Sequence, residues 1–239
     1  MYIGVLNFKG TITGSSPGTY MPALRYIERK NKVKALLIVI NSGGGDANAT
    51  EILYNQLMKI SSKKPVYALI EGIGASGAYW LACSAEKIFA MRTSLVGSIG
   101  VISMSPDFSE FLDTLGIKMR INKVGKYKDI NSPFRPMTEE ENTIYNNIMK
   151  DVYSVFREEV KKRRNLGEDI MEDIATGLVF SAEQAKKNGL IDGIANLETV
   201  VDELKAKTGT NSIKNLTPKR PFISRLMSMS FEAIYNVIK

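Results

Sequence analysis

The sequence has 239 residues, 44% of them hydrophobic, a formal net charge of +7 and no histidine. This length and apolar content suit one α/β domain with a substantial core. Because histidine is absent, the chain excludes a Ser-His-Asp triad, a Cys-His dyad and a histidine-ligated zinc site. A base that works near neutral pH must therefore be a lysine, a carboxylate, a tyrosine or the α-amine.

Apolar runs alternate with helix-period segments along the first half of the chain. The pattern predicts two helices at 21–30 and 50–61, a third that ends near residue 83, and strands at 2–8, 34–40, 65–70, 87–90 and 100–103. This alternation is typical of βα units around a largely parallel, covered sheet. The sequence therefore predicts an α/β fold.

The second half is more helical. The pattern predicts a helix at 108–115, a strand of alternating character at 117–124, and the longest helix after residue 136. Thr138 and Glu141 have the spacing of a capping box at the start of that longest helix. Ser181 and Gln184 repeat the spacing, and Gly189 is a suitable helix stop.

The C-terminal residues differ in composition from the rest. Residues 208–220 are polar, and the apolar residues of 221–239 fall on one helical face. We therefore divide the chain into a domain at 1–207 and a polar linker with an amphipathic helix at 208–239. That helix is expected to dock on its own or a neighbouring subunit, and peripheral contact with an anionic membrane is the alternative.

Neither a transmembrane run nor a secretory signal is visible in the sequence as written. We therefore expect a cytoplasmic protein, or a membrane-associated one if a membrane segment has been trimmed away. The positive charge does not predict a nucleic-acid partner. The basic run at 161–164 ends a helix pattern that begins with three glutamates at 139–141, which is the polarity that a helix dipole favours.

Two glycine-rich turns follow consecutive predicted strands, NSGGGD after Ile40 and EGIGASG after Ile70. The carboxyl ends of parallel strands share one edge of the sheet, where open α/β folds hold their sites. Three glycines in a row leave backbone N–H groups unshielded, which suits an oxyanion hole as well as a tight turn.

Ser76 lies in the second turn, where it is either a helix cap or a nucleophile. The neighbours of Ser76 are small, so a substrate could approach it closely. The segment is not a G-x-S-x-G nucleophile elbow, because position 78 is alanine. A lysine can serve as its base where the ammonium form is destabilised. Lys126 and Lys128 are the candidates, because both face one way in an extended chain, and the residues alone do not choose between them.

The motifs NSGGG, ASGAYWLA, GSIGV and GKYKDINSPFR, in this order and at these separations, resemble the signal peptide peptidase A family of Ser-Lys peptidases in its half-length form. The late segment GLVFSAEQAKKNGLID resembles the ending of that family, and the likeness covers about residues 1–200. Gly43 stands where the family usually has proline, and Ala78 where a second glycine is common. Members usually carry an N-terminal membrane anchor, which the sequence as written does not contain.

The resemblance implies a Clp-protease/crotonase-like fold of repeated ββα units. It implies Ser76 as the nucleophile, Lys128 as the general base and Ser98 as the residue that orients the lysine amine. The oxyanion hole would come from the N–H groups of Gly44 and Gly77, with Gly43 and Gly45 as alternatives.

The implied activity is a serine endopeptidase that cleaves signal-peptide remnants or other unfolded or short peptides without a metal or an organic cofactor. The implied assembly is a ring-like homo-oligomer whose subunits share active sites.

Two other classes compete with the peptidase. Acyl-CoA hydratases and isomerases of the crotonase type also use a glycine-lined oxyanion hole, with a carboxylate as acid and base, a role that Glu71 or Asp46 would take here. A catalytically inactive oligomeric scaffold with a relict site is the non-enzyme alternative.

Overall fold

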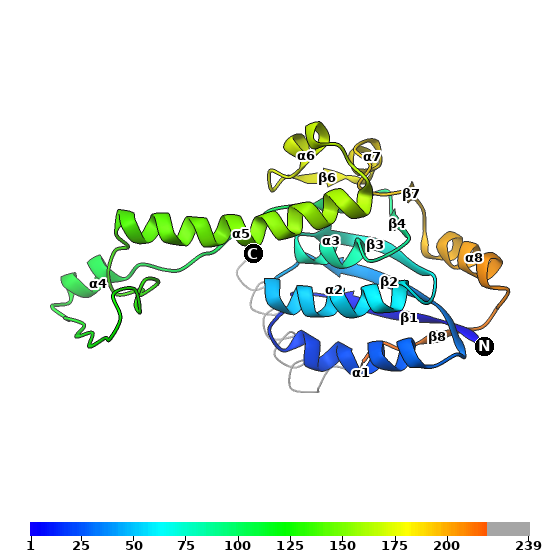
Figure 1. The fold of residues 1–239 in the computed structure, drawn as a ribbon, viewed down its shortest axis with the longest axis horizontal. Coiled ribbons are helices and arrows are strands. Elements are labelled where there is room, and N and C mark those ends of the chain that lie inside the picture. Colours follow the sequence, from blue (N-terminus) through cyan, green and yellow to red (C-terminus); the bar gives the residue numbers. More distant parts are fainter. Residues whose placement is uncertain (219–239) are drawn as a thin grey trace, which may run out of the picture. The chain divides into compact units, whose positions relative to one another are not determined.

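The computed structural model describes residues 1–218, so the helix expected at 221–239 lies outside the described residues. Figure 1 shows the elements, which are β1 (Tyr2–Lys9), α1 (Ser16–Arg29), β2 (Val33–Ser42), α2 (Ala47–Ser61), β3 (Val66–Ala75), α3 (Gly77–Ala82), β4 (Lys87–Ala90), β5 (Leu95–Gly97), α4 (Ser109–Thr114), α5 (Glu139–Arg164), α6 (Glu168–Ile174), β6 (Val179–Ser181), α7 (Ala182–Lys187), β7 (Gly193–Ile194), α8 (Leu197–Thr208) and β8 (Ile213–Asn215). The chain divides into two compact units. Of the described residues, the second unit contains 100–158, and the first contains 1–99 and 159–218.

The first unit is built on one sheet with the strand order β6-β5-β3-β2-β1-β8, to which β4 and β7 are added beside β3. Within the described residues β5 and β6 pair antiparallel, and the other strand pairs are parallel. The predicted α/β fold with a largely parallel sheet is therefore confirmed. β8 comes from the segment expected as a polar linker, where it pairs with β1.

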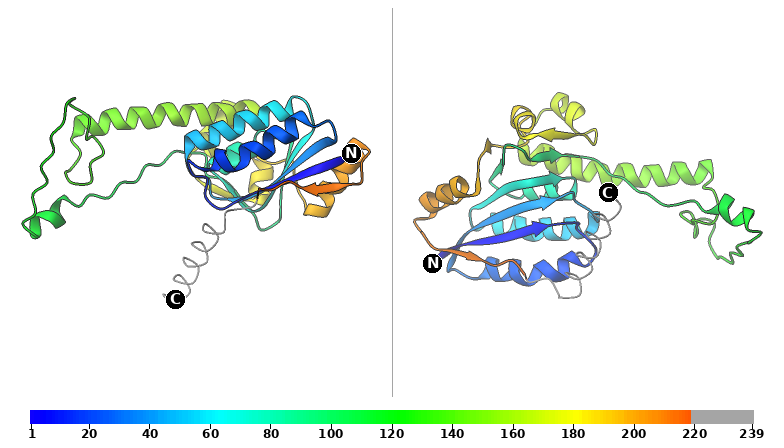
Figure 2. Two further views of the ribbon diagram at one scale, coloured as in Figure 1. Left: turned by 90° about the horizontal axis from the view of Figure 1, so that it is seen from below. Right: turned by 180° about the vertical axis from the view of Figure 1, so that it is seen from behind.

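The sheet is covered on both faces because its central strands are apolar at consecutive positions. On β2, Leu37 and Val39 pack in one cluster with Val200 and Leu204 of α8. Alternate residues of a strand point to opposite faces, so the intervening residues of β2 face the other layer. Figure 2 shows α1 and α2 side by side on a face of the sheet.

Helices α1 and α2 begin earlier than the apolar pattern indicates, because their starting signals are polar. Asp46 accepts a hydrogen bond from the Ala49 N–H at 2.7 Å and thereby caps α2. Helix α1 begins at Ser16, and Pro17 occupies its first turn, a position where proline needs no partner for a missing N–H.

The capping predictions for the later helices are confirmed. The Thr138 N–H donates to Glu141 Oε2 at 3.0 Å and the Glu141 N–H donates to Thr138 Oγ1 at 3.2 Å, which fixes the start of α5. Ser181 and Gln184 form the second capping box. Gly189 has a φ of 74° just after α7. Helix α5 has 26 residues and is the longest of the described helices, as predicted.

Two predicted strands are wrong. Residues 100–103 and 117–124 are not strands, whereas Leu95–Gly97 forms β5. The alternating pattern of 117–124 has an apolar set, but Ile117, Met119 and Ile121 are all exposed. A strand needs a partner backbone, and none pairs with these segments within the described residues.

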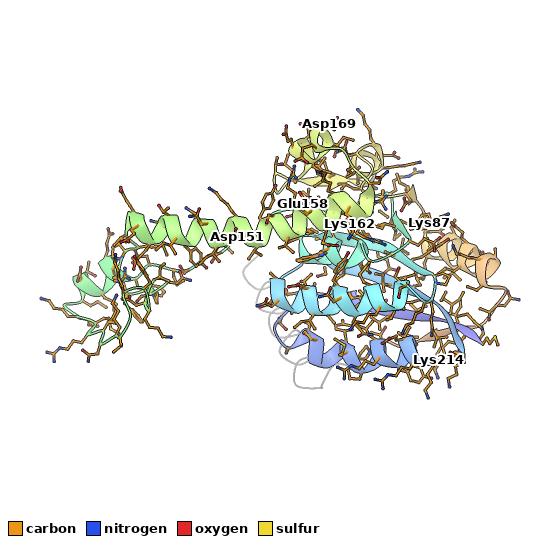
Figure 3. All side chains as sticks on the ribbon, in the orientation of Figure 1. Lys87, Asp151, Glu158, Lys162, Asp169 and Lys214 are labelled. Carbon is orange, nitrogen blue, oxygen red and sulfur yellow. The ribbon has the colours of Figure 1, made fainter. Side chains whose placement is uncertain are left out.

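The basic run that ends α5 is only partly solvated. Arg163 donates to the carbonyl of Cys83 at 2.8 Å, and Arg164 binds both carboxylate oxygens of Asp192, at 2.9 and 3.1 Å. Lys162 on the same turn is exposed and is labelled in Figure 3. The two arginines therefore tie the end of α5 to the loops beside the sheet.

None of the helices found among residues 1–218 has the length and apolar character needed to cross a membrane.

Candidate active site

The two glycine-rich segments meet at the carboxyl edge of the sheet, as predicted. Strands β2 and β3 are parallel neighbours, and Ser42 pairs with Gly74 near their ends. Strand β3 continues to Ala75, five residues past the predicted end, so most of EGIGASG is strand and not turn.

The extension of β3 depends on Asn41, which the sequence reasoning did not single out. Its Oδ1 accepts a hydrogen bond from the Ile73 N–H at 3.2 Å. A Cβ atom at Gly72 would lie 2.7 Å from that oxygen, so a glycine is needed beside the asparagine. The asparagine two positions before three consecutive glycines was the available signal.

Ser76 stands between β3 and α3 in a backbone conformation that L-residues rarely adopt, with φ 53° and ψ −130°. It occupies the N-cap position of α3, but its side chain makes no capping hydrogen bond. Its own N–H donates to the Gly97 carbonyl at 2.8 Å. The hydroxyl is therefore not used as a helix cap, and strain of this kind concentrates at functional sites.

At Gly44 and Gly77, the glycines beside Ser76, a side chain would collide with neighbouring atoms. A Cβ at Gly44, which has φ 92°, would lie 2.7 Å from the Gly77 nitrogen and 2.9 Å from the Ser76 Cβ. A Cβ at Gly77 would lie 2.5 Å from Oγ1 of the buried Thr50. Gly43 differs, because a Cβ there meets nothing within 4 Å.

The N–H groups of these glycines differ in their partners. The Gly44 N–H donates to Ser42 Oγ at 3.1 Å. The N–H groups of Gly43, Gly45 and Gly77 make no hydrogen bond within residues 1–218. Donors without protein partners beside a strained serine can bind an oxyanion.

Ser98 directly follows β5, as Ser76 directly follows β3. Ala75 of β3 pairs with Gly97 of β5, so Ser76 and Ser98 each follow one member of the same pair. Ser98 also has a positive φ, 50°, and its N–H donates to the Leu178 carbonyl at 2.7 Å. The structure thus brings the two predicted serines to adjacent strand ends.

Lys128 belongs to the second unit, whereas the serines and glycines belong to the first. It lies in a turn and not in extended chain, because its N–H donates to the Gly125 carbonyl at 3.2 Å. Its side chain is exposed, and its Nζ makes no hydrogen bond or ion pair within the described residues. Lys126, by contrast, binds Glu140 Oε2 at 2.7 Å, and this contact raises the pKa of Lys126.

Other reactive side chains of the first unit are already occupied. Asp46 caps α2, and Glu71 lies 3.5 Å from the amine of Lys9. Burial raises the pKa of the Cys83 thiol to about 12, so it is not a nucleophile near neutral pH.

A cavity of about 320 Å³ lies beside the glycine turn. The loop after β1 forms one wall and is held against the turn, since the Ile12 N–H donates to the Gly44 carbonyl and the Asp46 N–H donates to the Ile12 carbonyl, both at 2.9 Å. The residues that line the cavity include the apolar Phe8, Ile12 and Leu53, the hydroxyl-bearing Thr11, Thr13 and Thr19, and the charged Lys9. It therefore combines apolar, hydroxyl-bearing and positively charged residues.

A largely parallel sheet that carries a glycine turn and a strained serine at its carboxyl edge defines the class of the Clp-protease/crotonase-like fold, and the family model "Clp protease" matches residues 5–106. The model "Peptidase family S49" matches residues 58–211. This chain belongs to peptidase family S49.

Relatives that are named as proteases or signal peptide peptidases support the assignment to this family. The chain is 39% identical to a candidate protease of Methanocaldococcus jannaschii over 78% of this chain and 60% of that protein. It is 32% identical to a candidate signal peptide peptidase SppA of Enterococcus faecium over 78% of this chain and 54% of that protein. It is 30% identical to the chloroplastic serine protease SPPA of Arabidopsis thaliana over 85% of this chain and 31% of that protein. The chain thus spans between about a third and three fifths of these relatives.

Proposed function

We propose that the chain is a serine endopeptidase with Ser76 as nucleophile and Lys128 as general base. The observation that carries the proposal is the uncommitted Ser76 hydroxyl on strained backbone, flanked by Gly44 and Gly77. Ser76 Oγ attacks the scissile carbonyl carbon while the neutral amine of Lys128 accepts its proton. The lysine then protonates the departing amine, and it activates the water that releases the acyl group from Ser76.

Lys128 suits the role of base better than Lys126. A general base must give up its own proton before it can accept one. The carboxylate of Glu140 stabilises the ammonium form of Lys126, whereas Lys128 has no such partner in the described part of the chain. Ser98 is positioned at the strand end beside Ser76 and would hydrogen-bond the amine of Lys128.

The oxyanion hole would use the N–H groups of Gly77 and Gly44. Gly77 directly follows the nucleophile and has an unused N–H. The Gly44 N–H would exchange its bond to Ser42 for one to the oxyanion, and Gly43 and Gly45 remain the alternatives. One such donor contributes about 3 kcal/mol to transition-state stabilisation.

The substrates would be unfolded or short peptides, including signal-peptide remnants. The relative from Enterococcus faecium is named as a signal peptide peptidase, which supports this class. The cavity beside the glycine turn would accept one side chain of such a peptide, since apolar and hydroxyl-bearing residues are among those that line it.

A fluorophosphonate probe tests this function, because it reacts with serines that are activated as nucleophiles. We expect peptide mapping by mass spectrometry to find the label on Ser76, and we expect Ser76→Ala to lose both the label and peptide hydrolysis. A wild-type protein without label or turnover would be the inactive scaffold. Turnover of an acyl-CoA without labelling would instead identify a hydratase or isomerase.

We further propose a ring-like homo-oligomer with active sites shared between copies. The second unit exposes large apolar side chains that a neighbouring copy would cover, among them Ile102 at 77%, Met104 at 85% and Val124 at 98% exposure. Ser76 and Lys128 lie in different units of the chain, so a dyad can join the two units of neighbouring copies.

Mixed oligomers test the sharing. Ser76→Ala and Lys128→Ala chains are each expected to be inactive alone. Reassembled in equal amounts, they should recover about a quarter of the wild-type activity, since a shared site is intact when one chain supplies the serine and its neighbour the lysine. Activity that stays at the level of the single variants would place each dyad within one chain.

A further inference from the structure

The segment that carries Lys128 is held by charged contacts and not by an apolar core. Among residues 100–155 the one buried side chain is that of Glu141, which is 5% exposed. A buried carboxylate is strongly unfavourable unless it is paired and hydrogen-bonded. Its partner therefore decides whether this part of the second unit keeps its conformation.

That partner is Arg135. Its Nη1 and Nη2 donate to the two oxygens of Glu141 at 2.8 and 2.6 Å. The same guanidinium donates through Nε to Asp129 Oδ2 at 2.9 Å and through Nη2 to the Asp129 carbonyl at 3.2 Å. Arg135 thus joins the first turn of α5 to the residue that follows Lys128.

Both carboxylates stay ionised wherever a lysine base could work. Hydrogen bonds from Arg135 lower the pKa of Glu141 to about 2 and also lower the pKa of Asp129. Depressed carboxylate pKa values mean that the stabilisation is present above the unfolded values near 4 and is lost only as the pH falls through the folded values. The contacts therefore persist near neutral pH.

The residues before Lys128 are tethered to α5 as well, but by more exposed contacts. Lys126 donates to both oxygens of Glu140, at 2.9 and 2.7 Å, and the Tyr127 hydroxyl donates to Glu140 Oε1 at 2.5 Å. The Lys126 and Glu140 side chains are 67% and 57% exposed, and exposed ion pairs contribute little. The Arg135 and Glu141 side chains are 25% and 6% exposed.

We infer that Arg135 is a positioning residue for Lys128: by clamping Asp129 to Glu141, it fixes the turn from which the lysine amine is presented to Ser76. The inference rests on the proposed function. A displacement of about 1 Å in a catalytic group can reduce the rate a hundredfold, so the clamp should act on the chemical step. Lys128 itself stays free to contact the serine.

Kinetics of peptide hydrolysis by the full chain test the inference. Arg135→Gln should lower kcat by about tenfold to a hundredfold while KM changes by less than about twofold, because the lost function is placement of the base. Arg135→Lys should recover only part of kcat, since an ammonium cannot make the bidentate contacts of a guanidinium. Arg120→Gln is the matched control, because Arg120 is exposed in the same unit and has no partner in the described residues.

The outcomes separate the inference from the proposed function. A variant that has lost its fold is recognised by circular dichroism and by its size in solution. If Arg135→Gln is folded, a second readout applies, namely the fluorophosphonate labelling rate of Ser76, which should fall in parallel with kcat. Unchanged kcat and labelling in Arg135→Gln, with Lys128→Ala inactive, overturns the inference alone. Full activity of Lys128→Ala overturns the proposed function as well.

Discussion

Lys128→Ala is expected to lower kcat for peptide hydrolysis by at least about a hundredfold, the usual contribution of a general base. The chain has no histidine that could replace the amine. Lys126→Ala is the matched comparison, because it removes an equal side chain two positions away that is already paired with Glu140. Its kcat should stay within about threefold of wild type, since an exposed ion pair contributes little.

Steady-state kinetics on an unfolded peptide substrate measure both variants, with circular dichroism to show that each is folded. Ser76→Ala supplies the background rate. Equal losses in the two lysine variants would mean that the whole turn, and not one amine, is required. Loss in Lys126→Ala alone would assign the base to the other lysine.

Gly44→Ala is expected to lower kcat/KM by about a hundredfold or more, because the new methyl group enters the space of the oxyanion donors. Its Cβ would lie 2.7 Å from the Gly77 nitrogen, and the backbone φ of 92° is strained for alanine. Such strain costs about 1–3 kcal/mol, so the free energy of unfolding should fall as well.

Gly43→Ala provides the matched control for this substitution. The two glycines are adjacent, yet a Cβ at Gly43 meets nothing within 4 Å and its φ is not positive. Its kcat/KM should remain close to wild type, and urea unfolding should show no loss of stability. Similar activities for both alanine variants would remove Gly44 from the oxyanion hole.

Part of each unit could be predicted, because the signals are local. The apolar run of β2 and the capping residues of α5 act within a few positions of the chain, and both predictions are confirmed. The sequence also predicted that the two glycine-rich segments meet, because the carboxyl ends of parallel strands lie at one edge of the sheet.

The rest depends on contacts between distant residues. Gly72 reads as part of a turn, yet it lies inside β3, where the side chain of Asn41 on β2 occupies the space of a Cβ atom. The alternating residues 117–124 have no strand partner in the described chain, which periodicity alone does not reveal. The contacts of Arg135 with Asp129 and Glu141 depend on the conformation of the turn around Lys128, which the sequence pattern does not predict.

The distance between Ser76 Oγ and Lys128 Nζ in an experimental structure of the assembled protein decides whether the two residues form a dyad. We expect hydrogen-bond contact, about 2.6–3.2 Å, for one pairing of these atoms within or between copies. A structure in which the amine lies far from the hydroxyl in every pairing would contradict the Ser-Lys dyad.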